Sequence, residues 1–361
     1  TTNDDVMNTT DGLVSLREAI AYREFLVADG TIPWFASITF ATADQTIMVA
    51  GNTTGGGGTM TYPGVYENVR TFSSFLINSS GTTFIDGNGT TLDGSNSYAS
   101  LLKLQSTSQD LRLYVKNMTF QNVVNGNVSG GAVNAGITGE IVLDGCTVQN
   151  ITTNGALYGK NLTAIGTTFT QAGNYTVRTS DNLRANTVTL NGCIVDCAGT
   201  DGIYESGNLT LNSTLVLNTS IMMREGTLTL NNSTLTDISE VIVIGWLNMK
   251  NSILTCNVAN YYGVVALNIN SDADTVVTND EWIDADLSGY VTYVAGDILD
   301  ENYYLLVDLE GDNSSVNTLT DAYGNKRIVG GTVDLGALER PATLNAVEEA
   351  FAELFEEEWF D

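Results

Sequence analysis

Four carboxylates in the middle of the chain have the residue type and spacing that acid–base chemistry requires. They are Asp144, Asp196, Asp201 and Glu205. If the segments that carry them stack, acids on adjacent turns of the chain would meet the ~5 to ~9.5 Å separation that glycoside hydrolysis needs. Histidine is absent from the chain, which excludes the commonest general base and every triad built on it. The enzyme alternatives are therefore a glycoside hydrolase or a polysaccharide lyase.

A turn position explains the first of these carboxylates better than catalysis does. Asp144 stands in a Leu-Asp-Gly segment, at the place where similar segments carry Asn191 and Asn212, and such residues favour turns. A lyase would also need arginine or lysine to stabilise an anionic intermediate, and the middle of the chain offers only isolated basic residues, such as Arg178, Arg184 and Arg224. We therefore predict a protein that is not an enzyme.

Metal and cofactor sites are not indicated by the sequence. The chain has four cysteines: Cys146, Cys193, Cys197 and Cys256. No CxxC pair is present and no histidine completes a zinc site, and an extended segment would hold Cys193 and Cys197 ~13 Å apart, too far for a disulfide. We predict small buried core residues. Asp272 and Asp274 are a weak substitute for a calcium loop, so we predict no cofactor.

The acidic composition limits the partners that we expect. Acidic residues number 42 against 14 basic ones, and the formal net charge is −28, which disfavours nucleic acid as a partner. Solubility is the favoured reason for this charge, with attraction of divalent cations as the alternative. No stretch approaches the ~20 apolar residues of a membrane span, and no signal peptide is evident at Thr1. We expect a mature, soluble chain without a membrane span.

Three tyrosines near the predicted corners are candidate platforms for sugar rings. They are Tyr158, Tyr175 and Tyr204. Packing at the corners is the interpretation that we favour for them. A glycan-binding module without catalysis, with cell-surface glycans as partners, is nevertheless a further alternative function.

Self-similarity from about Leu111 onward is the strongest structural signal. Each repeat is a short alternating strand, a small polar turn and a second short strand. Successive repeats start 20, 26, 21, 19 and 19 residues apart, which is too short for a strand–helix–strand unit of ~30 residues and fits one coil of a β-solenoid. The repeats begin at Ile141, Asn161, Thr187, Asn208, Thr227 and Trp246.

Stacking of these repeats predicts an all-β fold, a right-handed parallel β-helix with coils of roughly 20 residues. Apolar residues of successive coils would form ladders at ~4.8 Å spacing, and asparagine, glycine and serine would turn the corners. A sandwich would need regular hairpin turns, which the sequence lacks. The predicted ladders are Leu190, Leu211 and Leu230; Ile194, Leu215 and Leu235; and Asn191, Asn212 and Asn231.

The two ends of a solenoid must be capped, because they expose its apolar interior. Ser15 and Glu18 fit a capping box, so we predict an N-terminal helix through Phe25 that covers the first coil. Residues 55–69 are predicted to form a loop that protrudes from a coil. We divide the chain into an N-terminal cap (1–45), β-helix coils (46–270), irregular C-terminal coils with an end motif (271–340) and an acidic helical tail (341–361).

The tail is predicted to be an amphipathic helix. Asn345 and Glu348 provide a helix start, and five apolar residues follow at helical spacing among seven acidic ones. Because such a helix is marginal alone, it should either cap the last coil or enter a groove on a neighbouring copy. The second arrangement would join copies head to tail. The candidate interface residues are Val347, Phe351, Leu354, Phe355 and Trp359.

Two sequence signatures enclose nearly the whole chain. The first runs through DGLVSLREAIAYREFL from Asp11, TTFIDGNGTTLDG from Thr82 and SGGAVNAG from Ser129, and the second extends from Asp321 to Glu339. Together they resemble bacterial secreted β-helix repeat proteins, which include surface proteins related to polymorphic outer-membrane proteins and autotransporter adhesin passengers. The resemblance implies export to the cell surface. We predict an extracellular structural or adhesive protein that self-assembles through its ends into a filament or surface layer.

Overall fold

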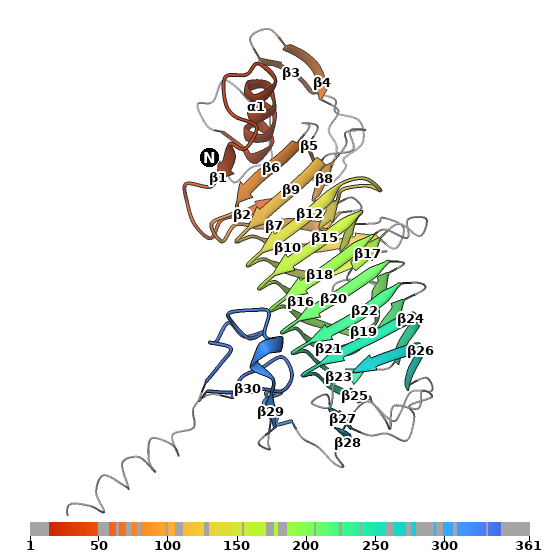
Figure 1. Cartoon of the computed structure of the whole chain (residues 1–361). Helices are drawn as coiled ribbons and strands as arrows, with labels where there is room; N and C mark the ends of the chain where they lie inside the picture. Colours follow the sequence, from red (N-terminus) through yellow and green to blue (C-terminus); the bar gives the residue numbers. More distant parts are fainter. Residues whose placement is uncertain are drawn as a thin grey trace, which may run out of the picture.

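The chain folds into an elongated stack of parallel β-strands. A computed structural model describes residues 14–340, apart from residues 50–57, 279–291 and several shorter interruptions. The strands of the stack belong to one continuous sheet that winds around the long axis, and strands of neighbouring coils pair in parallel (Figure 1). The predicted parallel β-helix is therefore confirmed.

Each coil passes through three faces, which we call the first, second and third face. First-face strands are β1 (Ser37–Thr39), β6 (Gly81–Asp86), β9 (Leu111–Lys116), β12 (Glu140–Asp144), β15 (Asn161–Ile165), β18 (Thr187–Asn191), β20 (Asn208–Asn212) and β22 (Thr227–Asn231). Second-face strands are β2 (Thr46–Met48), β7 (Thr91–Ser97), β10 (Thr119–Asn125), β13 (Thr147–Thr153), β16 (Thr168–Thr170), β23 (Thr234–Ile238), β25 (Ile253–Cys256), β27 (Val276–Thr278) and β28 (Thr292–Tyr293). Third-face strands are β5 (Phe75–Ile77), β8 (Leu102–Leu104), β11 (Val133–Asn134), β14 (Leu157–Gly159) and β17 (Val177–Thr179). Longer strands that turn from one face to the next are β19 (Ile194–Glu205), β21 (Leu215–Met223), β24 (Glu240–Lys250) and β26 (Gly263–Ser271).

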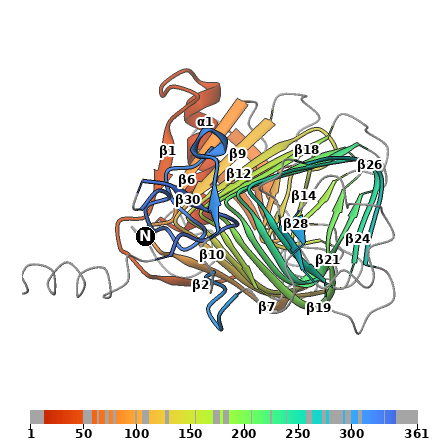
Figure 2. The same ribbon diagram turned by 60° about the horizontal axis from the view of Figure 1, so that its bottom comes forward.

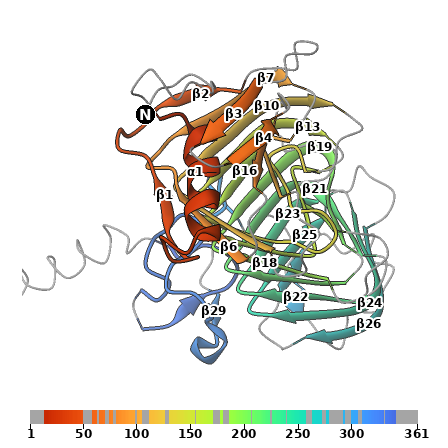
Figure 3. The same ribbon diagram turned by 90° about the horizontal axis from the view of Figure 1, so that it is seen from above.

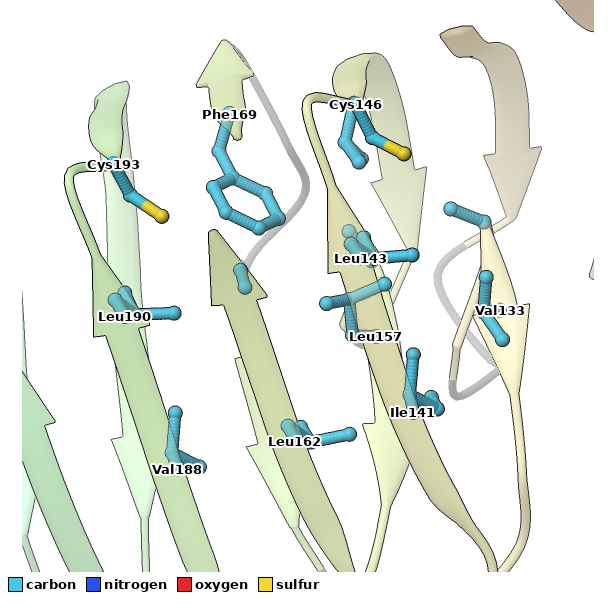
Figure 4. Packing of buried hydrophobic residues seen from close by; sticks show 14 of the residues in the cluster. Val133, Ile141, Leu143, Cys146, Leu157, Leu162, Phe169, Val188, Leu190 and Cys193 are labelled. Atoms are coloured by element: carbon cyan, nitrogen blue, oxygen red, sulfur yellow. The ribbon is translucent and has the colours of Figure 1, made fainter. Parts of the chain in front are cut away.

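Alternate residues of each strand point into the coil and form the core (Figure 4). On the first face, Leu211 is in register with Leu190 and Leu230, and all three are buried, as predicted. The predicted asparagine ladder is also present. Asn212 Nδ2 donates to Asn191 Oδ1 at 2.8 Å, and the next asparagine, in β22, donates to Asn212 Oδ1 at 2.9 Å.

The predicted ladder on the second face was wrong by one residue. Leu235 is in register with Val216, and Leu215 is in register with Thr234. Successive strand residues point to opposite sides of a sheet, so a shift by one residue exchanges the two sides. Leu215 and its neighbour Ile194 therefore face outward from the coil and not into its interior.

A left-handed residue turns each coil from the first face to the second. Eight such residues, which we call the corner column, have φ between 45° and 58°, a conformation that glycine and asparagine tolerate best. From Gly145 onward the next residue is a buried cysteine, threonine or serine. Where this residue is threonine or serine, its hydroxyl can bond to the carbonyl at the end of the preceding strand. Thr214 Oγ1 donates to Asn212 O, and Ser233 Oγ donates to Asn231 O, each at 3.0 Å. The corner column consists of Asn88, Asn117, Gly145, Gly166, Gly192, Ser213, Asn232 and Asn251.

Helix α1 (Leu16–Ala28) lies over the first coil (Figure 3). The predicted capping box is present: Glu18 N donates to Ser15 Oγ at 3.2 Å, and Ser15 N donates to Glu18 Oε2 at 2.9 Å. The buried Arg23 ties the helix to the coil, because its Nη2 donates to Thr82 O at 2.9 Å. The predicted N-terminal helix is confirmed. The described part of the chain contains no helix that is long and apolar enough to cross a membrane.

The structure adds detail in two regions, a predicted loop and the C-terminal coils. Strands β3 (Gly58–Tyr62) and β4 (Val65–Val69) pair as an antiparallel hairpin where a loop was predicted. At the other end, β27 pairs in parallel with β25 and β28. Parallel pairing on the second face therefore continues past residue 270.

The C-terminal residues 299–340, which we call the strap, lie along the side of the lower coils (Figures 1 and 2). The strap contains β29 (Glu310–Gly311), the 3-10 helix η2 (Asn313–Ser315) and β30 (Val333–Asp334), and β29 pairs antiparallel with β30. Its Ala337 and Leu338 pack on the outward-facing Leu215. The apolar side of the strap therefore buries the residues that the sequence pattern had assigned to the interior.

Candidate functional site

The predicted carboxylates are not brought together where their side chains are described. Asp144 ends β12 on the first face, whereas Asp196 lies in β19 on the second face, and the coil that contains β15 separates them. Through β15, Asp144 is in the same register column as Asn191, so its prediction as a strand-end turn residue is confirmed. The side chains of Asp201 and Glu205 lie outside the described residues.

Other predicted site residues also fall outside the part of the chain that the structure describes. Tyr158 is the exception, and it is half-buried in β14 on the third face. The roles predicted for the residues outside the described part of the chain stay predictions. The residues concerned are Val347, Phe351, Leu354, Phe355, Trp359, Asp272, Asp274 and Tyr175, together with the side chains of Tyr204 and Cys256.

Three cysteines are buried core residues, as predicted. Cys146, Cys193 and Cys197 are all buried. Burial raises the pKa of Cys146 to about 11 and the pKa of Cys193 to about 12, so both thiols stay protonated and unreactive near neutral pH. Among the described residues, no three side chains of His, Cys, Asp or Glu gather as they would to hold a metal ion.

Polar side chains on the second face bond to one another from coil to coil. Gln149 Nε2 donates to Gln121 Oε1 at 2.6 Å, and Gln121 Nε2 donates to Asp93 Oδ2 at 2.8 Å. A parallel ladder links Asn150 Nδ2 to Asn122 Oδ1 at 2.6 Å and Asn122 Nδ2 to Asp93 Oδ2 at 2.8 Å. These ladders run along the long axis and satisfy the polar groups that they join.

The strap binds the lower part of the corner column through its own backbone. Asn251 Nδ2 donates to Asp312 O at 2.8 Å, and Asn251 Oδ1 accepts from Asp312 N at 3.0 Å. Asn232 Nδ2 donates to Ser315 O at 2.8 Å. The corner residues from Gly192 to Asn251 are consequently buried.

A buried ion pair holds the strap in shape. Arg327 Nη1 lies 3.7 Å from Glu339 Oε2, and the two side chains are 1% and 2% exposed. Glu339 also accepts from Asp334 N at 3.1 Å and from Val329 N at 3.0 Å. Burial lowers the pKa of Arg327 and raises the pKa of Glu339, and in each case the partner's charge opposes the shift. Each charge therefore offsets the cost of burying the other.

The upper part of the corner column is open. Asn88, Asn117, Gly145 and Gly166 are exposed. A polar cavity of about 440 Å³ lies beside the first three of them. Its lining includes Asp44, Asn88, Asn117, Thr119, Gly145 and Thr147.

Aromatic side chains lie on the outer first face of the same upper coils and in the segment that precedes β1. Phe84 and Tyr114 are register partners in β6 and β9, with ring centroids 5.6 Å apart. Trp34 and Phe35 precede β1, form an edge-to-face pair at 5.6 Å, and are 56% and 57% exposed. Trp34 lies over Gly81, the first residue of β6. We call Trp34, Phe35, Phe84 and Tyr114 the aromatic strip.

Two carboxylates and a lysine border the aromatic strip. Asp86, Lys116 and Asp144 end successive first-face strands and are in register. Tyr114 OH donates to Asp144 Oδ2 at 2.5 Å, and Asn117 Nδ2 donates to Asp86 Oδ1 at 3.4 Å. The bond to Asp144, together with partial burial, raises the pKa of Tyr114 to about 12. The phenol is therefore a hydrogen-bond donor at every physiological pH.

Sequence reasoning missed the aromatic strip and its polar border. A signal was present, because the middle outward position of successive first-face strands holds Phe84 and Tyr114 in the upper coils but Thr189 and Thr210 in the lower ones. Alignment of the coils in register would have exposed this change.

No protein family, curated protein or solved structure matches the chain.

Proposed function

We propose that the chain is a non-enzymatic extracellular protein, structural or adhesive, that assembles with copies of itself through its ends. The observation that carries the proposal is the bonding of outer polar side chains from coil to coil, as in Asp93, Gln121 and Gln149. Amides and carboxylates bonded in this way stiffen a rod. They are also engaged with the scaffold and are not free to act on a substrate.

The solenoid architecture suits a display function. Each coil contacts only its neighbours, so a long surface is built from short repeats. The net charge of −28 favours the solubility of such an elongated, strand-rich chain. The resemblance of residues 11–26 and 321–339 to secreted surface proteins supports the extracellular location.

Assembly through the ends needs a ligand and a receptor on each copy. The tail offers five apolar residues at helical spacing, which include Phe351 and Trp359. The N-terminal cap offers an apolar pocket of about 290 Å³ between α1 and β1, lined in part by Leu16, Tyr22 and Phe40. A helix that enters a groove on the next copy makes a heterologous contact, which propagates into a filament.

Sedimentation velocity over a concentration series tests the proposal. We expect the full chain to form progressively larger species, and a variant without residues 345–361 to remain monomeric. Phe351→Ser with Trp359→Ser should behave like the deletion, whereas Glu356→Gln with Glu357→Gln should still assemble, because it keeps the apolar residues. A full chain that stays monomeric at high concentration and does not respond to the deletion would overturn assembly through the tail.

The enzyme alternative has its own test. Purified chain would be incubated with neutral and acidic polysaccharides, and the release of reducing ends and of unsaturated products would be measured. We expect no release above background. Activity that disappears in Asp196→Asn and Asp201→Asn would contradict the non-enzymatic function.

A further inference from the structure

The upper and lower parts of the first face differ in chemistry. In β18 and β20 the outward side chains are threonine and asparagine, as at Thr189 and Thr210. In the upper coils the corresponding positions carry Phe84 and Tyr114, and the segment before β1 adds Trp34 and Phe35, which are more than half exposed. Clustered aromatic rings exposed to water indicate a contact surface.

We propose that the aromatic strip and its polar border bind a neutral oligosaccharide, an inference that rests on the adhesive part of the proposed function. A pyranose ring has an apolar C–H face and a rim of hydroxyls. The rings of Trp34 and Phe84 offer flat apolar surface to such a face. Asp86 can accept from hydroxyls, whereas Lys116 and Asn117 can donate to them.

The arrangement of the border favours a sugar over a protein partner. Carboxylate, ammonium and amide groups lie within one to three residues of the rings along the same strands, as Lys116 and Asn117 do beside Tyr114. A protein-docking patch has an apolar centre depleted of charge. Alternation of rings with hydrogen-bonding groups suits a ligand whose own surface alternates in the same way.

The size of the strip sets the length of the ligand. It extends from the segment before β1 across β6 to β9, and Asp144 borders it in β12. Three coil spacings of ~4.8 Å give about 14 Å, enough for roughly two to three sugar rings. The polar cavity beside Asn117 continues the surface around the corner.

The charges select against acidic sugars. Arg112 is already bound to Glu140, with Nε to Oε2 at 2.7 Å, which leaves Lys116 between Asp86 and Asp144. The surroundings of the strip are therefore net negative, in keeping with the whole chain. A uronate or sialylated chain would be repelled, whereas a neutral chain would not.

Isothermal titration of the full chain with defined hexasaccharides tests the inference. The probes are hexamers of β-1,4-linked glucose, N-acetylglucosamine, mannose and xylose, with hexagalacturonate as the acidic counterpart. We expect at least one neutral hexamer to bind and hexagalacturonate not to bind. Trp34→Ala should weaken binding about tenfold or more, since a stacked aromatic residue is a typical binding hot spot.

The matched control is Trp246→Ala. Trp246 is 52% exposed at the lower end of the same face, in register with Thr227 and far from the aromatic strip. The Trp246→Ala variant should bind sugar like the unmodified chain, and both variants should melt at the same temperature as that chain.

Failure of all neutral hexamers to bind, or an equal loss of sugar binding in the two variants, would overturn the inference. A Trp34→Ala variant that alters sedimentation while no sugar binds would instead identify a protein interface. The tail variants test assembly separately. A full chain that assembles but binds no sugar would therefore overturn this inference and leave the proposed assembly standing.

Discussion

The upper and lower coils share one corner geometry but expose it differently. Asn117 and Asn251 have φ of 51° and 45°, yet Asn117 is exposed and Asn251 is fully buried. The strap accounts for the difference, because the backbone of Asp312 bonds to both the Nδ2 and the Oδ1 of Asn251. The same corner is thus exposed to solvent in the upper coils, whereas in the lower coils it is the site where the strap binds.

The outward column of the second face changes at the same level. Thr147 and Thr168 are in register with each other and half-exposed. Ile194 and Leu215 continue the column and lie against the strap. The strap therefore docks where the column becomes apolar, and the place of docking is encoded in outward residues of the coils.

The largest effect is expected from breaking the buried ion pair of the strap. Arg327→Met leaves Glu339 buried without its partner charge and should cost about 3–5 kcal/mol of strap stability. The matched change in the upper coils is Arg112→Met, whose exposed pair with Glu140 should contribute less than about 1 kcal/mol. Urea unfolding, combined with hydrogen exchange of the strap, measures both. Equal effects of the two substitutions would remove the distinction between covered and open coils.

The second prediction concerns the outward column. Leu215→Ala should destabilise the chain by about 2–5 kcal/mol, because it leaves a cavity beneath the strap. Thr147→Ala, in the open part of the same column, should stay within about 1 kcal/mol. Thermal unfolding of the two variants compares them. Only a small loss of stability in Leu215→Ala would mean that the strap does not pack firmly on the coils.

The corner column itself gives the third comparison. Asn251→Ala and Asn117→Ala each place alanine at positive φ, with a similar cost of about 1–2 kcal/mol. Asn251→Ala should cost a further ~1–3 kcal/mol, because the backbone N–H and C=O of Asp312 lose the Asn251 side chain as their hydrogen-bond partner. Denaturant unfolding gives both values. If the two variants were equally stable, the strap bonds would contribute nothing.

The smallest effect is expected in alkaline solution. The pKa of Cys146 rises from its usual value of 9.0 to about 11 through burial. Its contribution is fully present below pH 9 and is lost as pH rises through 11, because the unfolded chain loses the thiol proton first. Cys146→Thr copies Thr167, which follows it in the same buried column. This variant should be as stable as the unmodified chain near pH 7 within about 1 kcal/mol. A pH series of melting temperatures that shows the same alkaline decline in both chains would contradict this role of the thiol.

The fold was predictable because one pattern recurs in every coil. The corner residues and the Leu190, Leu211 and Leu230 ladder follow directly from it. The orientation of Leu215 was not predictable from that pattern, since Leu215 and Val216 are both apolar and either could face inward. Only the strap, more than 80 residues later in the chain, makes an outward leucine favourable.

The candidate site was predictable only in part. Asp144 was found as a turn residue because its coil has close equivalents. The aromatic strip was missed because three separate segments contribute it, around Trp34, Phe84 and Tyr114. Which positions of these segments line up depends on the register between coils of unequal length, which strand propensity alone does not determine.

Electron microscopy of the purified full chain tests the central proposal most directly. The account predicts rods that join end to end into filaments or a lattice, and isolated rods when residues 345–361 are removed. Monodisperse single rods of the full chain at high concentration, indistinguishable from those of the shortened chain, would contradict it.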